Sequence, residues 1–472
     1  MSVTDLPGAQ LDRPMFLRQL STDEYSPLPY TKRDGRTISR VQDTLREQAW
    51  RRNTPVRLLA DSKSATAAGL DALNREWGDV YYQIPPDALA DEDAAVDAFS
   101  GFDRVIDVQT HFMASGAYPS FPAEMLIQLY RDIMPDWWQD LEGEKPKWDI
   151  AQWLTDIFIR SENTMGVLTS SPGLTDLRNL FNPEMAATRA LIERFGGSGR
   201  LLTHAVVHAN VASDTDQMQQ WADELHPNGW KVYTMGQLTM NGWTEPWMLD
   251  DDRFGTPFLE KVRAIGPKVV CTHKGISQMV DNGSPRDLGP AAARFPDIQF
   301  LVYHSGYEFF TESPAEGEYN EQTANQGVNR LISSVLGAGI ESGGNVSAEL
   351  GTSWFALTRR PEDAAHVLGK LVKYLGEDNV IWGSDSIWYG APQPILDAFR
   401  CFQIPDAMCD RYGYAKLTDE VKHKILYKNA CRAYGVDMDD VVARTANDEV
   451  TWARDALAEI EKNGADFLRG GR

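Results

Sequence analysis

Short apolar runs alternate with amphipathic helical patterns from Arg104 to about residue 436. The runs are rich in Val and Ile and too short for helices, which is typical of buried strands in a parallel sheet. We count eight of them, at residues 104–112, 165–173, 200–210, 229–236, 268–275, 298–306, 345–354 and 379–388. The pattern therefore predicts repeated β-α units.

Helix start signals lie between several of these runs. Asn182 precedes PEMAATRALIERF, Ser213 and Asp214 open DQMQQWADEL, and Pro361 opens PEDAAHVLGKLVKYL. Eight β-α units over about 340 residues fit a (β/α)8 TIM barrel with insertions. A doubly wound open sheet is the alternative, but no G-x-G-x-x-G follows the first run, so its dinucleotide-binding form has no support.

The two ends of the chain have a different texture from the barrel region. Residues 1–99 form an N-terminal extension, mostly helical or irregular, with helices expected near 39–52 and 62–77 and no recognisable chemistry. We expect the barrel to span residues 100–445 and a helical tail to occupy residues 446–472. The chain thus predicts one catalytic barrel with added segments.

Composition narrows the possible functions. The chain has 46 Lys and Arg against 68 Asp and Glu, a net charge of −22, which excludes a nucleic-acid binder driven by electrostatics. The first thirty residues have no apolar core of a signal peptide, and no run of about 18 apolar residues occurs, so we expect a cytoplasmic protein without membrane contact. The four cysteines are too scattered for a disulfide framework, and buried free thiols are expected.

Polar side chains stand at the C-terminal ends of the predicted strands, where catalytic groups of a barrel converge. Asp107, Gln109 and His111 have i, i+2 spacing and should face one side of the first strand. His273, His304 and Asp385 end strands five, six and eight. Imidazole and carboxylate ligands of this kind are what an open catalytic metal site needs.

Each of these residues could also have a purely structural role. A single His at a strand end is more often a hydrogen-bonded structural residue, but three of the eight histidines occupy equivalent places, which favours a shared site. His208 is a possible further ligand or substrate contact, whereas His204 is expected to be a satisfied core residue. The remaining three, at positions 226, 366 and 423, are expected at the surface.

Four motifs follow one another along the chain: THKG with His273, YHSG with His304, WGSDS with Asp385, and the closing helix ILYKNACRAYG. Together they resemble the amidohydrolase-related branch of the amidohydrolase superfamily, to which aminocarboxymuconate-semialdehyde decarboxylase and its relatives belong. The resemblance covers roughly residues 104–436 and is carried by the order and spacing of the motifs. The first 100 residues lie outside it.

The resemblance implies a distorted barrel with one divalent metal ion, usually zinc and otherwise manganese or iron. By analogy His111 and His273 would be ligands, Asp385 a ligand or the partner of the metal-bound water, and His304 the general acid/base. The family's first strand normally carries H-x-H, and Gln109 replaces the first of these histidines. A glutamine oxygen is a poorer zinc ligand, so affinity should fall or the preference should shift toward a harder ion.

Two residues on later strands are secondary candidates. Glu349 on strand seven is a possible ligand that compensates for Gln109. Other amidohydrolases use a carboxylated lysine on strand four, where Lys231 lies, but such sites usually keep both histidines of strand one. We therefore expect Lys231 to extend toward solvent or to meet a carboxylate such as Glu349.

Fifty-two residues separate Met113 from Gly166, and this insertion should cover the site. Aromatic residues and methionines there and after strand four are more often core than pocket, yet both segments follow strands whose ends face the metal. They suggest an apolar or aromatic small-molecule substrate. The candidates are Met125, Trp137, Trp138, Trp148 and Trp153 in the insertion and Trp243, Trp247 and Met248 after strand four.

Three functions remain open at this point. The first is a metal-dependent hydrolase that uses activated water on a carbonyl-type bond, and the second a metal-dependent, non-oxidative decarboxylase of an aromatic or unsaturated acid. A decarboxylase should present a cationic group over the metal, for which Arg160 and Arg131 are candidates. The third is a non-catalytic barrel that has lost the metal. A homodimer is possible, since members of the family are often dimers.

Overall fold

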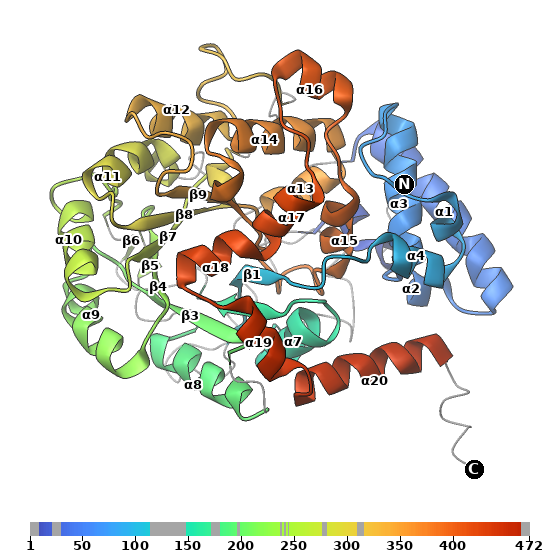
Figure 1. Cartoon of the computed structure of the whole chain (residues 1–472), viewed down its shortest axis with the longest axis horizontal. Coiled ribbons are helices and arrows are strands. Elements are labelled where there is room, and N and C mark those ends of the chain that lie inside the picture. The colour runs from blue at the N-terminus through green and yellow to red at the C-terminus, as the bar shows by residue number, and fades with distance from the viewer. Residues whose placement is uncertain are drawn as a thin grey trace.

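The computed structural model describes residues 9–20, 30–113, 148–170, 180–195, 199–236, 238–239, 242–243, 245–275, 281–308 and 316–463. Its centre is an eight-stranded parallel sheet in the order β1-β2-β3-β4-β7-β8-β9-β10 (Figure 1). The strands are β1 (Ile106–Thr110), β2 (Met165–Leu168), β3 (Leu201–Val206), β4 (Gly229–Tyr233), β7 (Val269–His273), β8 (Gln299–Tyr303), β9 (Val346–Glu349) and β10 (Val380–Ile381).

The sheet closes on itself between its first and last strands. The Val108 amide donates to the Trp382 carbonyl at 3.2 Å, and the His111 amide donates to the Ser386 carbonyl at 2.8 Å. Thr110 and Ser386 form a parallel bridge at the same seam. The predicted (β/α)8 barrel is therefore confirmed.

Alternation along the strands separates two cores. In β8, Phe300 and Val302 belong to the large core under the helices, whereas Leu301 and Tyr303 belong to a smaller core that fills the barrel. Side chains of a strand alternate between its faces, so nearly continuous apolar runs supply both cores at once. The runs become polar at the C-terminal ends of the strands, so these ends are available for a functional site.

Helices surround the barrel in the order that the sequence predicts. Pro361 is the first residue of α14, as expected from the fixed φ of proline at that position. The helices after β1 are α7 (Ile150–Leu154), the π-helix η5 (Thr155–Ile159), α8 (Asn182–Glu193), α9 (Ala212–Leu225), α10 (Gly255–Ile265), α11 (Leu288–Arg294), α12 (Asn329–Gly337), α13 (Ser353–Thr358), α14 (Pro361–Tyr374), α15 (Gln393–Cys401), α16 (Asp406–Tyr412), α17 (Asp419–His423), the π-helix η10 (Lys424–Lys428), α18 (Asn429–Tyr434), α19 (Met438–Thr445) and α20 (Glu449–Asn463).

Within the first hundred residues, the described segments 9–20 and 30–100 pack against one side of the barrel, beside α15 (Figure 1). Their helices are α1 (Lys32–Arg52), α2 (Val56–Leu59), α3 (Lys63–Trp77) and α4 (Glu92–Ala98). The Tyr82 hydroxyl donates to the Thr358 carbonyl at 2.6 Å, and Tyr82 forms a bridge with Phe402. The segment thus shares the main core with the barrel.

Three local expectations are wrong or incomplete. The run 345–354 was expected to be one strand, but β9 ends at Glu349 and α13 begins at Ser353. His366 is buried rather than exposed, because its position faces the core side of α14 and its Nδ1 bonds the Tyr414 hydroxyl at 2.9 Å. His423 is half-buried, with Nε2 3.2 Å from the Gly101 carbonyl.

Two other expectations concern the cysteines and the membrane. Cys271, Cys401 and Cys409 are buried free thiols, and Cys431 is a half-buried one. Within the residues that the structure describes, every helix is too short or too polar to cross a bilayer.

Candidate metal centre

The end of β1 meets the segment after β10. His111 Nε2 lies 3.0 Å from Asp385 Oδ1, and Gln109 Nε2 lies 2.8 Å from the same oxygen. All three side chains are buried. The structure thus brings together three of the residues that the sequence singled out, from opposite ends of the barrel domain.

The tautomer of His111 follows from its other nitrogen. Nδ1 lies 2.8 Å from the Thr169 carbonyl oxygen, which can only accept, so Nδ1 carries a proton. In neutral imidazole Nε2 then holds a lone pair, and this lone pair faces a carboxylate oxygen of Asp385. Two acceptors at 3.0 Å repel unless a proton or a metal cation lies between them.

Asp107 does not join this group, contrary to the simple spacing argument. The register of β1 against β2 shifts between Asp107 and Thr110, and a bulge of this kind breaks the alternation of side chains. Asp107 Oδ1 instead accepts from the backbone of Ser384 at 2.9 Å. Burial raises the pKa of Asp107 to about 6, although the hydrogen bonds from Ser384 and Gln109 oppose the shift.

Asp385 is held on its other side by Thr352, whose hydroxyl donates to Oδ2. Both residues have a positive φ, 54° for Thr352 and 59° for Asp385. His304 and Ser305 share this property, with 60° and 57°. Such conformations cost about 1–3 kcal/mol each and cluster at functional sites. Strained backbone therefore surrounds the strand ends that carry the candidate residues.

His273 and His304 form a second pair at the ends of β7 and β8. Their ring centroids lie 4.7 Å apart in an edge-to-face arrangement, and His273 stacks on Tyr233 at 5.2 Å. His304 Nδ1 lies 2.9 Å from the Gly351 carbonyl, so this nitrogen carries a proton. Nε2 is then the basic nitrogen of His304.

Glu349 lies between the two pairs. Its Oε2 accepts from the His304 amide at 3.0 Å and its Oε1 from the Gly351 amide at 2.6 Å. A Cβ on Gly351 would lie 2.5 Å from Gln109 Oε1 and 2.6 Å from Glu349 Oε1, so only glycine leaves room for both side chains. Burial raises the pKa of Glu349 to about 8, the His304 neighbourhood lowers it, and Asp385 raises it.

The donor set can be tested against a divalent cation. Among the described residues, no group of three His, Cys, Asp or Glu side chains is arranged to hold a metal ion. His111 and Asp385 supply two donors, and Gln109 Oε1 is a buried oxygen that has no hydrogen-bond partner among these residues. An amide can be turned so that this oxygen points at an ion. Imidazole, carboxylate and amide oxygen together fit a divalent cation, with a harder preference than three histidines would have.

Other predicted site residues lie elsewhere. His208 follows β3 and is buried with Nδ1 2.9 Å from Asp214 Oδ2, a hydrogen-bond partner that the sequence did not suggest. His204 is a core residue, as expected, with Nε2 2.9 Å from the Tyr434 hydroxyl. Burial, followed by the charge of Lys231, lowers the pKa of His204 to about 3, so it stays neutral.

The aromatic candidates divide between core and undescribed chain. The expectation that Lys231 extends toward solvent is wrong, because the residue is fully buried, with its Nζ 3.6 Å from the centroid of the Tyr303 ring. Trp148, Trp153 and Trp247 are buried core residues, and Trp148 packs edge-on against Trp388 at 5.5 Å. Met248 is half-buried. Met125, Arg131, Trp137, Trp138 and the side chain of Trp243 lie outside the described residues.

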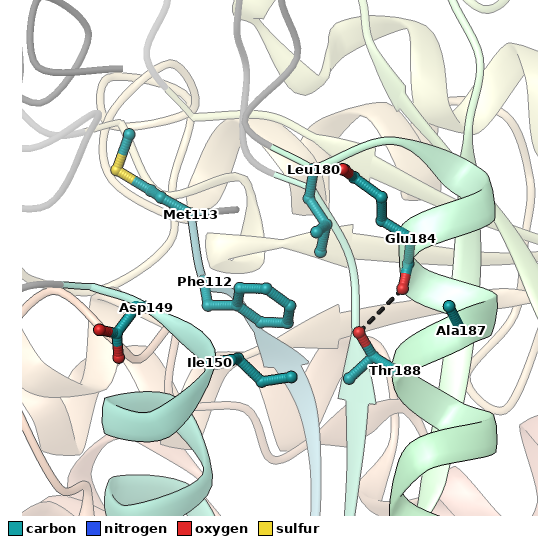
Figure 2. A pocket seen from close by; sticks show the side chains of 8 residues that line it. All are labelled: Phe112, Met113, Asp149, Ile150, Leu180, Glu184, Ala187 and Thr188. Atoms are coloured by element: carbon teal, nitrogen blue, oxygen red, sulfur yellow. Dashed lines mark hydrogen bonds between the residues drawn. The ribbon is translucent and has the colours of Figure 1, made fainter. Parts of the chain in front are cut away.

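A mostly apolar pocket of about 270 Å³ lies between α7 and α8. One of its lining residues is Phe112, which follows His111 in the chain. Figure 2 shows Phe112, Ile150 and Leu180 pointing into it. Its other lining residues are Met113, Asp149, Glu184, Ala187 and Thr188.

Sequence reasoning missed Thr352, Thr169 and Trp388. Thr352 was placed inside a predicted strand, and its two neighbours Gly351 and Ser353 were the available signal for a turn. Thr169 contacts His111 through its backbone carbonyl. Every residue has such a carbonyl, so the sequence gives no signal for this contact. Trp388 lies 6.2 Å from the His111 ring, between centroids.

A sequence model of the amidohydrolase family matches residues 106–436. The match covers well over half of the chain, so the chain belongs to the amidohydrolase family. It extends from β1, through His111, His273, His304 and Asp385, to the helix after η10. No curated protein matches the sequence.

Several solved structures match the chain at low sequence identity. An uncharacterised TIM-barrel protein from Bordetella bronchiseptica is 15% identical, with a TM-score of 0.48, covering 71% of this chain and 100% of that one. A 5-carboxyvanillate decarboxylase from Sphingomonas paucimobilis is 16% identical, with a TM-score of 0.41 and coverages of 71% and 99%. A dihydroxybenzoic acid decarboxylase from Polaromonas, solved with manganese and an inhibitor, is 12% identical, with a TM-score of 0.36 and coverages of 70% and 96%.

Proposed function

We propose that this chain is a metal-dependent hydrolase that acts on a carbonyl-type bond of a small, apolar or aromatic substrate. The observation that carries the proposal is the approach of His111 Nε2 to Asp385 Oδ1 at 3.0 Å while Nδ1 is committed to the Thr169 carbonyl. These two acceptors need a proton or a cation between them, and we propose that a bound metal ion fills this role. A histidine whose other nitrogen donates to a backbone carbonyl is the usual form of a metal ligand.

His111, Asp385 and Gln109 would hold the metal, and His273 stays the predicted fourth ligand. When bound, a divalent cation polarises a carbonyl group and lowers the pKa of a coordinated water to about 7. Manganese or another harder ion becomes as plausible a partner as zinc, because Gln109 offers an oxygen where the family has imidazole.

His304 supplies the proton transfer. Its Nδ1 proton is fixed on the Gly351 carbonyl, so Nε2 takes a proton from the attacking water and returns it to the leaving group. The Glu349 carboxylate accepts a hydrogen bond from the His304 amide and thereby fixes the backbone from which this imidazole extends. The buried surroundings exclude bulk water and strengthen each of these interactions.

The choice between hydrolysis and decarboxylation rests on the surroundings of the site. A decarboxylase should hold the substrate carboxylate with a cationic side chain. Of the two candidates, Arg160 is exposed at the end of η5, and Arg131 lies outside the described residues. The apolar pocket beyond Phe112 supports an apolar group on the substrate. These features keep hydrolysis as the main proposal and decarboxylation as its competitor.

Metal content and product analysis test the proposal together. Inductively coupled plasma mass spectrometry of the purified full chain should find about one divalent ion per chain in wild type and much less in His111→Ala. The loaded protein is then offered aryl esters, lactones and hydroxybenzoates. Acid release on a pH-stat supports hydrolysis, whereas carbon dioxide release supports the decarboxylase. A wild-type chain that takes up neither Mn²⁺ nor Zn²⁺ would be the non-catalytic barrel.

A further inference from the structure

A tight turn after β9 contacts both groups of candidate residues. It contacts Asp385, which lies beside His111 and Gln109, and His304, which pairs with His273. The Ser353 amide donates to the Gly351 carbonyl at 2.5 Å, across the single residue Thr352. Thr352 has φ 54° and ψ −45°, close to the classic γ-turn, which is rare and strained. A β-branched residue is a poor choice there, because its branched Cβ is crowded at positive φ. Local conformational preference therefore does not explain this threonine.

The first and the central residue of the turn contact the site. The Gly351 carbonyl accepts from His304 Nδ1 at 2.9 Å, and the Thr352 hydroxyl donates to Asp385 Oδ2. Thr352 is almost fully buried, so water cannot replace its hydroxyl at Asp385. With Oδ2 occupied by Thr352, Oδ1 is the oxygen that faces His111 and Gln109.

We propose that Thr352 is a positioning residue for the metal site: its strained turn holds the hydroxyl on Asp385 Oδ2 and so presents Oδ1 to the cation. The inference rests on the proposed function, since it assumes that Asp385 is a ligand. It adds a residue that the sequence comparison did not identify. A hydrogen-bonded carboxylate ligand is oriented before the ion arrives, which is the known effect of outer-shell partners on metal affinity.

The test is isothermal titration of the metal-free full chain with Mn²⁺ alone, repeated with Zn²⁺. Thr352→Val removes the hydroxyl at constant shape and should weaken Mn²⁺ binding by about 10-fold to 100-fold. Thr352→Ser keeps the hydroxyl and should bind within about threefold of wild type. Thr352→Gly relieves the positive φ, so it should melt no earlier than wild type and still lose affinity as Thr352→Val does.

The matched control is Thr358→Val. Thr358 is also a buried threonine, at the end of α13, and its hydroxyl donates to the Trp354 carbonyl at 2.8 Å. This variant should keep the wild-type affinity, because its hydroxyl does not contact the candidate ligands. Loss of affinity in the valine and glycine variants with rescue by serine supports the proposal.

Two results would overturn it, and they are distinguishable. If wild type binds Mn²⁺ or Zn²⁺ and Thr352→Gly binds equally well, Thr352 does not position the ligand and the proposed function survives. If folded wild type binds neither ion, both the positioning role and the proposed function fail. Should Thr352→Val not fold, the glycine and serine variants decide the question alone.

Discussion

The imidazole of His304 donates its Nδ1 proton to the carbonyl oxygen of Gly351 at 2.9 Å, from a backbone with φ of 60°. This single bond fixes which nitrogen of His304 is basic. It also ties the end of β8 to the turn that follows β9. The imidazole of His304 and the carboxylate of Asp385 are therefore linked through two adjacent residues of one turn, Gly351 and Thr352.

His304→Asn separates proton transfer from metal binding. Asparagine tolerates positive φ, and its amide NH₂ can replace Nδ1 as donor to Gly351, but it has no basic nitrogen. We expect kcat to fall by about 10²-fold to 10⁴-fold while the metal content stays at the wild-type level. The measurement is steady-state kinetics beside mass spectrometric metal analysis. Loss of the metal in this variant would instead indicate that His304 is a metal ligand.

Gln109→His restores the H-x-H pattern of the family. The new imidazole should raise Zn²⁺ affinity by about tenfold or more, with a smaller gain for Mn²⁺, because zinc favours nitrogen ligands. Competition titration with a chromophoric chelator measures both constants. An unchanged preference between the two ions would show that residue 109 lies outside the coordination sphere, whatever the absolute affinity.

Lys63 connects the N-terminal helices to the barrel. Its Nζ lies 3.2 Å from both carboxylate oxygens of Asp397, which is buried in α15, and 2.9 Å from Glu162. Lys63→Met leaves Asp397 with the ion pair to Arg400 at 3.2 Å and the hydrogen bond from the Gln393 amide at 2.8 Å. We expect a loss of about 2 kcal/mol in the free energy of unfolding, below the ~3–5 kcal/mol of a fully broken buried pair.

Urea denaturation of the full chain measures this loss, and Lys416→Met provides the control. Lys416 pairs with Asp406 at 2.7 Å, but both side chains are mostly exposed, so no measurable change is expected. Equal effects of the two substitutions would mean that the buried network does not hold the N-terminal helices to the barrel.

Asp156 gives the protein a pH-dependent stability. Burial raises the pKa of this carboxyl in η5 from 3.8 to about 6, so the folded chain holds its proton more tightly than the unfolded chain. The resulting stabilisation is complete below pH 3.8 and is lost as pH rises through 6. At pH 8 the ionised group therefore destabilises the fold by about 3 kcal/mol relative to a neutral one.

Asp156→Asn removes this ionisation. The variant should match wild type near pH 4 and become more stable with rising pH, by up to about 3 kcal/mol at pH 8. Thermal and urea unfolding at a series of pH values measure the difference. A difference that stays constant between pH 4 and pH 8 would contradict the raised pKa.

The strand pattern of the sequence was sufficient for the barrel, and its motifs for the family. Continuous apolar runs are what strands buried on both faces of a parallel sheet require, and the runs of this chain fill two cores at once. Closure of the barrel then brings the end of β1 to the segment after β10, so the meeting of His111 with Asp385 could be expected from topology.

Only the tertiary structure decided how these side chains are used. The bulge in β1 turned Asp107 toward Ser384, which spacing along an ideal strand cannot foresee. The tautomers of His111 and His304 depend on backbone carbonyls of Thr169 and Gly351, and carbonyls are common to every residue type.

Thr352 shows the same limit most clearly. Its turn is locally unfavourable for threonine and is held by contacts with β8 and with the segment after β10. A sequence reveals the local conformational preference of each residue. A strained conformation, in contrast, is maintained by contacts with residues that are distant in the sequence. The sequence by itself therefore determined the barrel, the family and the ends of its strands. The packed structure determined which atoms face each other at the site.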